Sequence, residues 1–460
     1  MQRLFAITWL TWKAAFRFRL FVVIAVLLLA TVVALPVLIK DDGTARGFTQ
    51  ILLTYTLSVI SALLGLSTLW LACGTLARDI EECQMQMVAV KPIARWQIWL
   101  GKWLGIVTLN AALLALAGGS VYALLQWRAT KLPLEEQHVL RNEVLVARAA
   151  AKERSFASEI EKETDSVMAE RLKQSPVAQV DRKLLRNQIR EQIKAELQLV
   201  PPGGFRFWDI DLGSAAKELQ DRPLYLRVKF NAAQKSPSGT FIAFWQAGSA
   251  ELKRVWRSEA MSLAPDTFHE IELPPGLVGP DGILSVGFRN LNETALLFPL
   301  EDGMEVLYRE SGFALNYVRG LGIILCWMAL LAALGLASAS FLSFPVAAFF
   351  SLALLLMSVS TGTLANVVEE GTVMGSNSET GEVGSSVIDF VAVPFFRVVL
   401  TVINLAKDFS PVDALSTGRS ITWGELGRAV GQIVLVLGGI FAVFGIYVFS
   451  RRELATAQQQ

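Results

Sequence analysis

The charged residues whose spacing is most informative lie in Arg78–Lys102, a polar segment between two long apolar runs. Acidic side chains come first in this segment and basic side chains come last, an arrangement that can set the register of a bound partner. Pro92 interrupts any helix in the middle, so we expect a helix, a turn and a second helix. A segment of this kind at a membrane face is well placed to be held by a soluble partner.

Catalytic motifs are absent from the sequence. There is no GxxxxGK[ST] phosphate loop, no GxSxG elbow and no HExxH zinc motif. The two histidines, His138 and His269, lie far apart, and the three cysteines have neither zinc nor disulfide spacing. We therefore expect no catalytic residue, metal site or cofactor in this chain. The acidic pair Glu369-Glu370 is either a cation or proton site or, as we favour, part of a solvated acidic loop.

Composition indicates a membrane protein that carries a polar part. Hydrophobic residues make up 53% of the 460 residues and charged residues only 18%. A globular enzyme of this length is less apolar. The apolar composition makes the lipid membrane an expected partner. The formal net charge of +1 gives no sign of nucleic-acid binding, so nucleic acid is not an expected partner.

Six stretches are expected to cross the membrane, since roughly 20 helical residues span a hydrocarbon layer of about 30 Å. Basic residues before the first stretch and after the second place both flanks in the cytoplasm by the positive-inside rule. Residues 1–19 are either an interfacial helix or only a basic flank. The six stretches are Leu20–Ile39, Ile51–Leu76, Trp103–Trp127, Tyr317–Ala337, Phe344–Leu364 and Gly431–Phe449.

Val387–Ala406 is nearly long enough to be a further span, but it contains Asp389, Pro394 and Arg397. A central arginine costs a few kcal/mol on membrane-insertion scales. We therefore expect a re-entrant or interfacial segment.

The region between the third and fourth spans is expected to be extracytoplasmic and to have two parts. Apolar residues at helical spacing predict a helical arm over 128–200, either a contact arm or, as we favour, a spacer. After Pro201-Pro202-Gly203-Gly204 the period changes to two, which predicts an antiparallel β-sandwich over 201–314. Trp245 and Trp256 are either core residues, as we favour, or sugar-stacking residues. The predicted strands lie within 222–230, 239–248, 251–259, 267–274, 282–290 and 304–311.

The predicted fold is a polytopic α-helical membrane protein with six transmembrane helices and an inserted extracytoplasmic domain, made of a helical arm and an antiparallel β-sandwich. Its four parts are an N-terminal membrane part (1–127), the arm (128–200), the sandwich (201–314) and a C-terminal membrane part (315–460).

The membrane parts resemble bacterial ABC transporter permeases of the type-2 exporter (ABC-2) family. The resemblance covers 1–127 and 315–455 but not 128–314. Cys83-Gln84-Met85 departs from it, because the family often has Gly-Thr-Leu there. The matching residues are Asp79-Ile80-Glu81, Lys91-Pro92-Ile93-Ala94-Arg95, Gly101-Lys102, Pro411 with Asp413, Gly418, Arg419 and Trp423, and Val448-Phe449-Ser450-Arg451-Arg452-Glu453-Leu454.

The resemblance implies a permease subunit of an ATP-driven transporter in the bacterial inner (cytoplasmic) membrane. It implies a homodimer, or a heterodimer with a second permease, in which each subunit rests on a separate ABC ATPase subunit that holds ATP and Mg²⁺. Residues 78–102 would form the cytoplasmic coupling loop. The contact residues would be Asp79, Glu81, Glu82, Met85, Met87, Lys91, Pro92, Ile93 and Arg95.

Two alternatives stay open at this point. The chain could be a membrane-anchored sensor or adhesin, with the sandwich as a binding module for carbohydrate or for another ligand. It could also keep the ATPase partner but transmit motion to external proteins instead of moving a substrate. A further alternative for the loop itself is that it merely anchors the chain at the membrane surface.

Overall fold

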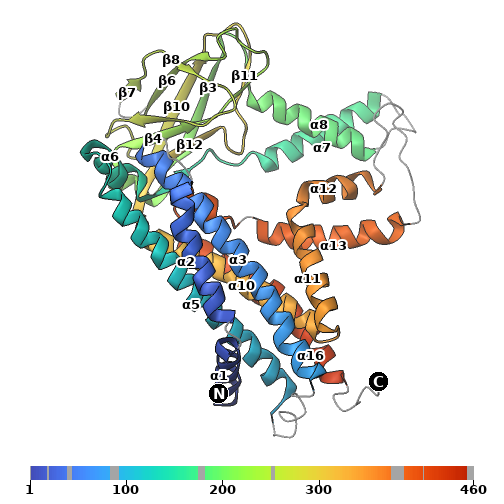
Figure 1. The fold of residues 1–460 in the computed structure, drawn as a ribbon. Coiled ribbons are helices and arrows are strands. Elements are labelled where there is room, and N and C mark those ends of the chain that lie inside the picture. Colours follow the sequence, from blue (N-terminus) through green and yellow to red (C-terminus); the bar gives the residue numbers. More distant parts are fainter. Residues whose placement is uncertain are drawn as a thin grey trace. The chain divides into compact units, whose positions relative to one another are not determined.

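The computed structural model describes residues 2–17, 20–38, 44–82, 93–174, 182–249, 254–373, 388–407 and 409–452. The chain forms two compact units, which we call the helical unit (residues 1–147 and 311–460) and the sheet unit (residues 148–310). Figure 1 shows the helices and strands of both. The sequence prediction placed the boundaries of the inserted region at 127/128 and 314/315 instead.

Local sequence signals explain where several helices of the helical unit begin. The Thr44 hydroxyl accepts a hydrogen bond from the Gly47 amide at 3.0 Å, and the Thr422 hydroxyl accepts one from the Glu425 amide at 3.0 Å. Both are N-cap interactions. The helices are α1 (Gln2–Arg17), α2 (Leu20–Leu38), α3 (Ala45–Glu81), α5 (Arg95–Ala129), α6 (Leu134–Val139), the π-helical η1 (Leu140–Val144), α10 (Phe313–Ala339), α11 (Phe344–Val359), α12 (Thr361–Glu370), α13 (Asp389–Lys407), α14 (Pro411–Ser416), and α15 (Trp423–Ala429), which continues through the π-helical η3 (Val430–Gly438) into α16 (Gly439–Arg451).

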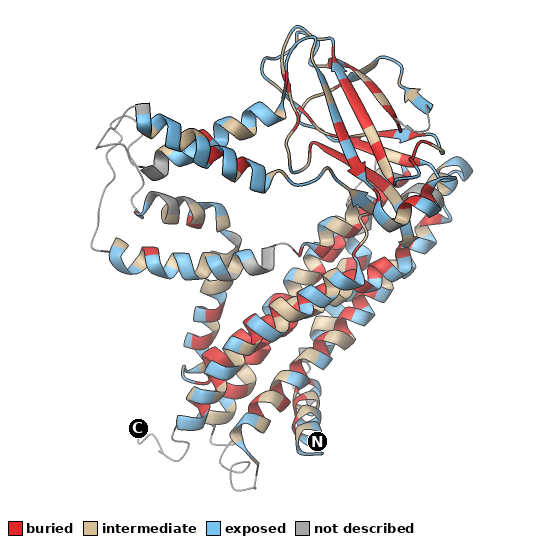
Figure 2. Ribbon diagram, turned by 180° about the vertical axis from the view of Figure 1, so that it is seen from behind, coloured by how far each residue is buried: buried red, intermediate tan, exposed pale blue. Residues whose placement is uncertain are grey.

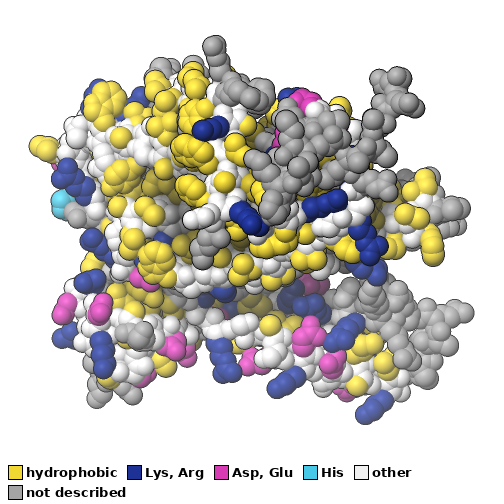
Figure 3. All heavy atoms as spheres, turned by 90° about the horizontal axis from the view of Figure 1, so that it is seen from below, with side chains coloured by type: hydrophobic (Ala, Val, Ile, Leu, Met, Phe, Trp, Pro, Cys, Tyr) yellow, Lys and Arg dark blue, Asp and Glu magenta, His cyan; other side chains and the backbone are white. Residues whose placement is uncertain are grey.

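Among the described residues, four helices are long and apolar enough to cross a membrane. They are α3, α5, α10 and the continuous helix Trp423–Arg451, and they match the second, third, fourth and sixth predicted spans. Shorter apolar stretches, Val22–Leu35 and Phe344–Ser358, fall at the first and fifth predicted spans. Figure 3 shows many hydrophobic side chains on the surface seen from below. These features indicate a membrane protein.

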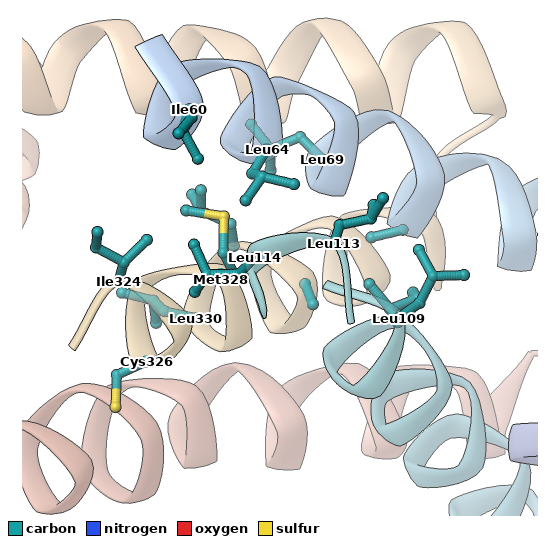
Figure 4. Close-up of a cluster of buried hydrophobic side chains, with 14 of the residues drawn as sticks. Ile60, Leu64, Leu69, Leu109, Leu113, Leu114, Ile324, Cys326, Met328 and Leu330 are labelled. Carbon is teal, nitrogen blue, oxygen red and sulfur yellow. The ribbon is translucent and has the colours of Figure 1, made fainter. Parts of the chain in front are cut away.

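The core of the helical unit forms where α3, α5 and α10 pack together. Leu64, Leu113 and Met328 are buried there, and their side chains converge in Figure 4. Small residues allow the helices to approach closely: a Cβ added to Gly335 of α10 would lie 2.7 Å from the Cβ of Ala72 of α3. In lipid the hydrophobic effect does not drive helices together, so close packing between small residues is a main source of helix association.

Helix α1 packs one of its faces against α5. The Thr8 hydroxyl donates to the carbonyl oxygen of Gly101 at 3.2 Å, and Trp12 Nε1 donates to the Thr108 hydroxyl at 2.9 Å. Phe5 and Trp9, on the other side of α1, remain exposed. Exposed aromatic rings beside basic residues suit a headgroup layer.

Helix α13 covers most of Val387–Ala406, the segment that the sequence predicts to be re-entrant or interfacial, and it runs across the direction of α11 in Figure 1. Arg397 and Phe390 are exposed, and Pro394 lies inside the helix. The Asp389 carboxylate accepts a hydrogen bond from the Val373 amide at 2.9 Å, near the start of the helix. These features are compatible with the re-entrant or interfacial segment that the sequence predicts.

The sheet unit contains antiparallel sheets whose inward side chains share one core. A four-stranded sheet has the order β1-β12-β4-β9, a five-stranded sheet has the order β3-β10-β6-β7 with β8 beside β6, and a small sheet has the order β2-β11-β5. The strands are β1 (Val146–Ala151), β2 (Leu199–Val200), β3 (Phe205–Asp211), β4 (Leu224–Val228), β5 (Asn231–Ala232), β6 (Phe241–Ser249), β7 (Arg254–Arg257), β8 (Met261–Leu263), β9 (His269–Leu273), β10 (Ile283–Asn290), β11 (Leu296–Leu297) and β12 (Met304–Gly312), with η2 (Gly213–Ala215) and α9 (Ala216–Leu219) between β3 and β4.

Aromatic rings pack together in this core. Figure 2 shows many buried residues along the strands. Trp245 is only 2% exposed and lies 4.7 Å from Phe288 and 5.9 Å from Phe298, measured between ring centroids. Trp245 is therefore a core residue, as the sequence analysis favoured, and Trp256 packs partly buried against the same core.

Each of the six predicted strand stretches contains an observed strand: β4, β6, β7, β9, β10 and β12. The arm prediction succeeds in part. Helices α7 (Ala157–Gln174) and α8 (Arg182–Gln198) pack together, but Val146–Ala151, which lies within the predicted helical arm, forms strand β1. The small residues of β1 pair with β12, and this tertiary pairing overrides the helical propensity of alanine.

Charged side chains are buried on the four-stranded sheet. Glu305 of β12 is fully buried and lies 3.2 Å from Arg227 of β4, the residue directly opposite it in the strand pair. Lys152 approaches Glu305 at 4.0 Å. Arg148 binds Glu270 through two hydrogen bonds of 3.0 and 3.2 Å. Such paired charges satisfy one another where water is excluded.

Candidate functional site

The segment Arg78–Lys102 is shared between two long helices. Helix α3 continues to Glu81, and α5 begins at Arg95, so much of the predicted polar segment extends the two apolar helices. At 1.5 Å per residue, the 37 residues of α3 measure roughly 55 Å, well beyond the hydrocarbon thickness. A helix of this length extends past the hydrocarbon at one end or at both. Met85, Met87, Lys91 and Pro92 lie outside the described residues.

Asp79 and Lys102 bind α3 to α5. The Lys102 ammonium lies 2.6 Å from the Asp79 carboxylate and also donates to the Thr75 carbonyl oxygen at 2.7 Å. The side chain of Lys102 is only 11% exposed, while that of Asp79 is 34% exposed. The cation is thus largely removed from water and depends on these two oxygen atoms. We infer that this pair fixes the ends of α3 and α5 side by side.

Glu81 connects the same end of α3 to α11. Its carboxylate accepts a hydrogen bond from the Phe344 amide at 2.9 Å, at the start of α11, where a helix presents unpaired N–H groups and a partial positive charge. The guanidinium group of Arg78 lies 4.3 Å from the centre of the Phe344 ring. Helix α3 therefore contacts both the backbone amide and the side-chain ring of Phe344.

Arg95 connects the start of α5 to the end of α16. Its Nη1 donates to the carbonyl oxygens of Phe449 at 2.9 Å, Ser450 at 2.8 Å and Arg452 at 2.8 Å. A cation at a helix C-terminus complements the helix dipole and the unpaired carbonyls. Arg452 in turn donates to the Ser340 carbonyl at 3.1 Å, just after α10.

The remaining described residues of the predicted site make more modest contacts. Glu82 is exposed at the end of α3, and its backbone N–H bonds the Arg78 carbonyl at 2.8 Å. Ile93 is partly buried against the core of the helical unit. We call the contacts of Asp79, Glu81, Arg95, Lys102 and Arg452 the helix-end junction.

The helix-end junction connects the ends of several long helices. Its hydrogen bonds join the ends of α3, α5, α10, α11 and α16 and use carbonyl oxygens, amides and one ion pair. Within the part of the chain that the structure describes, no group of three His, Cys, Asp or Glu residues can hold a metal ion. A displacement of the connection between α3 and α5 would therefore act on several long helices at once.

Replacing Arg95 with glutamine is expected to loosen the C-terminal end of α16. The substitution removes a charged donor from three carbonyl oxygens, at an expected loss of about 1–2 kcal/mol. Hydrogen–deuterium exchange of residues 445–452 should increase. Arg428→Gln, which changes an exposed arginine at the other end of the same continuous helix, is the matched control and should leave exchange at 445–452 unchanged. Equal exchange in the two variants would contradict the capping role.

Sequence reasoning did not identify the partners that lie far along the chain. Phe344 lies 263 residues from Glu81, and Arg452 lies 357 residues from Arg95. Ser340 lies 112 residues from Arg452. Spacing alone cannot pair residues so far apart. Lys102 was noted as one of the bases of the segment but was not assigned to the site. Lys102 lies beside the acidic end of α3 because α3 and α5 are antiparallel neighbours in the fold, and the sequence alone does not reveal this packing.

A separate apolar hollow of about 440 Å³ lies between α5 and α10. Tyr122 and Tyr317 are the polar-tipped residues in its wall, and the Tyr317 hydroxyl donates to the Gly118 carbonyl at 2.9 Å. The hollow therefore provides apolar contact area but no acid–base chemistry. The other lining residues are Ala111, Leu114, Ala115, Gly119, Ala314, Val318, Leu321, Gly322 and Leu325.

No family model, curated protein or solved structure matches this chain.

Proposed function

We propose that this chain is the membrane subunit of an ATP-driven transporter of the ABC-2 permease type. A separate ATPase subunit would bind and hydrolyse ATP with Mg²⁺, and residues 78–102 would receive its motion. The observation that carries the proposal is the helix-end junction: both ends of this segment are fastened to several long helices, so force applied between them has a direct route into the helical unit.

The junction also refines the roles of the predicted contact residues. Asp79, Glu81 and Arg95 use their charged groups for contacts within the chain. They are therefore proposed to transmit force, and the residues between the two helices are proposed to touch the ATPase. Met85 and Met87 suit this role on sequence grounds, because methionine adapts its shape to an apolar partner surface.

Six spans, of which α2 and α11 would be the two shorter ones, belong to this proposal. So does the topology, with the helix-end junction on the cytoplasmic side of the bacterial inner membrane and residues 128–314 outside. Basic residues near the relevant span ends support that orientation. A homodimer or a heterodimer with a second permease completes the proposed assembly.

The test is purification of the full chain from its native membrane in mild detergent, followed by mass spectrometry and an ATPase assay. We expect an ATP-hydrolysing subunit to copurify. Replacing Met85 and Met87 together with glutamate should reduce its recovery by at least about tenfold, because two charges enter an apolar contact. Met168→Glu in α7 is the matched control and should retain the partner.

Two results would contradict the proposal: no ATPase in the purified material, or unchanged recovery of the ATPase by the Met85 and Met87 variant. The first result would favour the sensor or adhesin alternative. Retained ATPase with no transported substrate would favour transmission of motion to external proteins.

A further inference from the structure

One face of the five-stranded sheet carries aromatic and basic side chains that the core does not use. Phe205 and Phe207 of β3 are 59% and 57% exposed, while Trp208 and Ile210 of the same strand point into the core. Large aromatic rings exposed in pairs on a sheet are uncommon unless they contact a ligand or partner. We call the surface formed by Phe205, Phe207, Phe244, Gln246, Arg257 and Arg289 the aromatic face.

The strand register places these side chains in two adjacent rows. Phe205 is paired with Arg289 of β10, which is paired with Phe244 of β6. In the next row Phe207 is paired with Gly287, Gly287 with Gln246, and Gln246 with Arg257 of β7. Rows two residues apart along a strand are separated by roughly 7 Å, so the face offers rings and polar groups within the span of a short oligosaccharide.

Both exposed phenylalanines are held in place. The guanidinium group of Arg289 lies 4.9 Å from the centre of the Phe205 ring. Phe207 lies over Gly287: a Cβ added to Gly287 would be 2.7 Å from Phe207 Cε1 and 2.8 Å from Gln246 Cγ. The glycine thus permits the ring and the amide to rest against the sheet. Rings fixed before binding lose little conformational entropy when a ligand stacks on them.

The charges of the aromatic face indicate the sign of its ligand. Arg257 and Arg289 are exposed, and neither has an ion-pair partner among the described residues. The nearby acid Asp209 accepts a hydrogen bond from the Ser285 hydroxyl at 2.5 Å, and Asp211 accepts one from the Gly213 amide at 2.7 Å. These two acids lie further along β3, so the charged residues within the aromatic face itself are Arg257 and Arg289, both positive. A carboxylate can bind a guanidinium group through two parallel hydrogen bonds.

We propose that the aromatic face binds an acidic saccharide. The apolar C–H faces of the sugar rings would stack on Phe205 and Phe207, the hydroxyl groups would bond to Gln246, and the carboxylates would pair with Arg257 and Arg289. A purely apolar partner fits less well, because it would bury both guanidinium groups without a counter-charge. The proposal depends only on the sheet unit and is independent of an ATPase partner.

The test uses the full chain in lipid nanodiscs, with polygalacturonate as the acidic probe and dextran as the neutral control, in buffer of physiological ionic strength. Biolayer interferometry should show saturable binding of polygalacturonate and much weaker binding of dextran. The pair Phe205→Ala with Phe207→Ala and the pair Arg257→Gln with Arg289→Gln should each weaken binding by about tenfold or more. Phe268→Ala, next to β9 of the four-stranded sheet, and Arg222→Gln, just before β4 of that sheet, are matched controls that should bind normally.

Three outcomes would overturn the proposal. One is no saturable binding by the folded chain. Another is loss of binding in the arginine pair alone, which would indicate general attraction of polyanions. The third is binding to vesicles of anionic lipid without binding to polygalacturonate, if Phe205→Ala with Phe207→Ala abolishes the vesicle binding. This result would make the aromatic face a membrane-docking surface. Unchanged melting temperatures of the variants would show that loss of binding is not loss of folding.

Discussion

Replacing Glu305 with alanine is expected to lower the free energy of unfolding of the sheet unit by about 3–5 kcal/mol. Glu305 is fully buried, and its removal takes away the carboxylate that lies 3.2 Å from the largely buried guanidinium group of Arg227. The stability of β4 and β12 can be followed in the full chain by hydrogen–deuterium exchange in increasing denaturant. Protection of residues 224–228 and 304–308 should be lost at a lower denaturant concentration.

Glu161→Ala is the control for this prediction, because it removes an acid from an ion pair in the same unit. Glu161 lies 2.7 Å from Arg186, but both side chains are more than 40% exposed. Water replaces the lost partner there, so the expected loss is below about 1 kcal/mol. Replacing Glu305 and Arg227 together with methionine should recover much of the stability, since both charges of this buried pair are removed together. Similar losses in the Glu305 and Glu161 variants would show that burial does not determine the effect.

Asp79→Ala is expected to destabilise the helical unit by about 2 kcal/mol. This is less than the effect of breaking a fully buried ion pair, because Asp79 is 34% exposed and retains some contact with water. Lys102 would keep its hydrogen bond to the Thr75 carbonyl but lose its counter-charge. The purified chain in detergent should melt at a lower temperature. The expected functional consequence is weaker coupling, since the ends of α3 and α5 could then move separately.

The double variant Asp79→Leu with Lys102→Leu separates the two effects of that substitution. It removes the buried cation together with its partner, so stability should largely return. The polar connection between α3 and α5 would still be absent, so ATP-driven activity should stay low. Glu135→Ala, an exposed acid of α6, controls for loss of a negative charge alone. Full recovery of activity in the double variant would contradict the role of the ion pair in transmission.

Sequence periodicity predicted much of the fold where one pattern extends over a whole element. In Leu224–Val228 aliphatic residues alternate with Tyr225 and Arg227, and the stretch forms strand β4. The apolar run in α10 forms a long helix. Strand β3 was missed because Phe205 and Phe207 face outward whereas Trp208 and Ile210 face inward, so apolar residues occupy both faces and hide the alternation. The aromatic face was missed with it.

The candidate site could be predicted only as a segment. The order of acids and bases in Arg78–Lys102 marked the region, and Asp79, Glu81 and Arg95 do take part in the helix-end junction. Their partners could not be found from spacing, because Phe344 and Arg452 are brought close to these residues only by the packing of α3, α10, α11 and α16. Resemblance to a family supplied a role for the segment but not these contacts.

Cross-linking from the middle of the segment tests the central claim most directly. Met87→Cys would be treated in native membrane vesicles with a short thiol-to-amine cross-linker, alongside Gln460→Cys as a marker for the side of the membrane. We predict that Cys at 87 is labelled from the same, cytoplasmic side as Cys at 460, that it cross-links to an ATPase, and that the yield changes when ATP is added. Labelling of the two positions from opposite sides, or no cross-linked ATPase, would contradict the account.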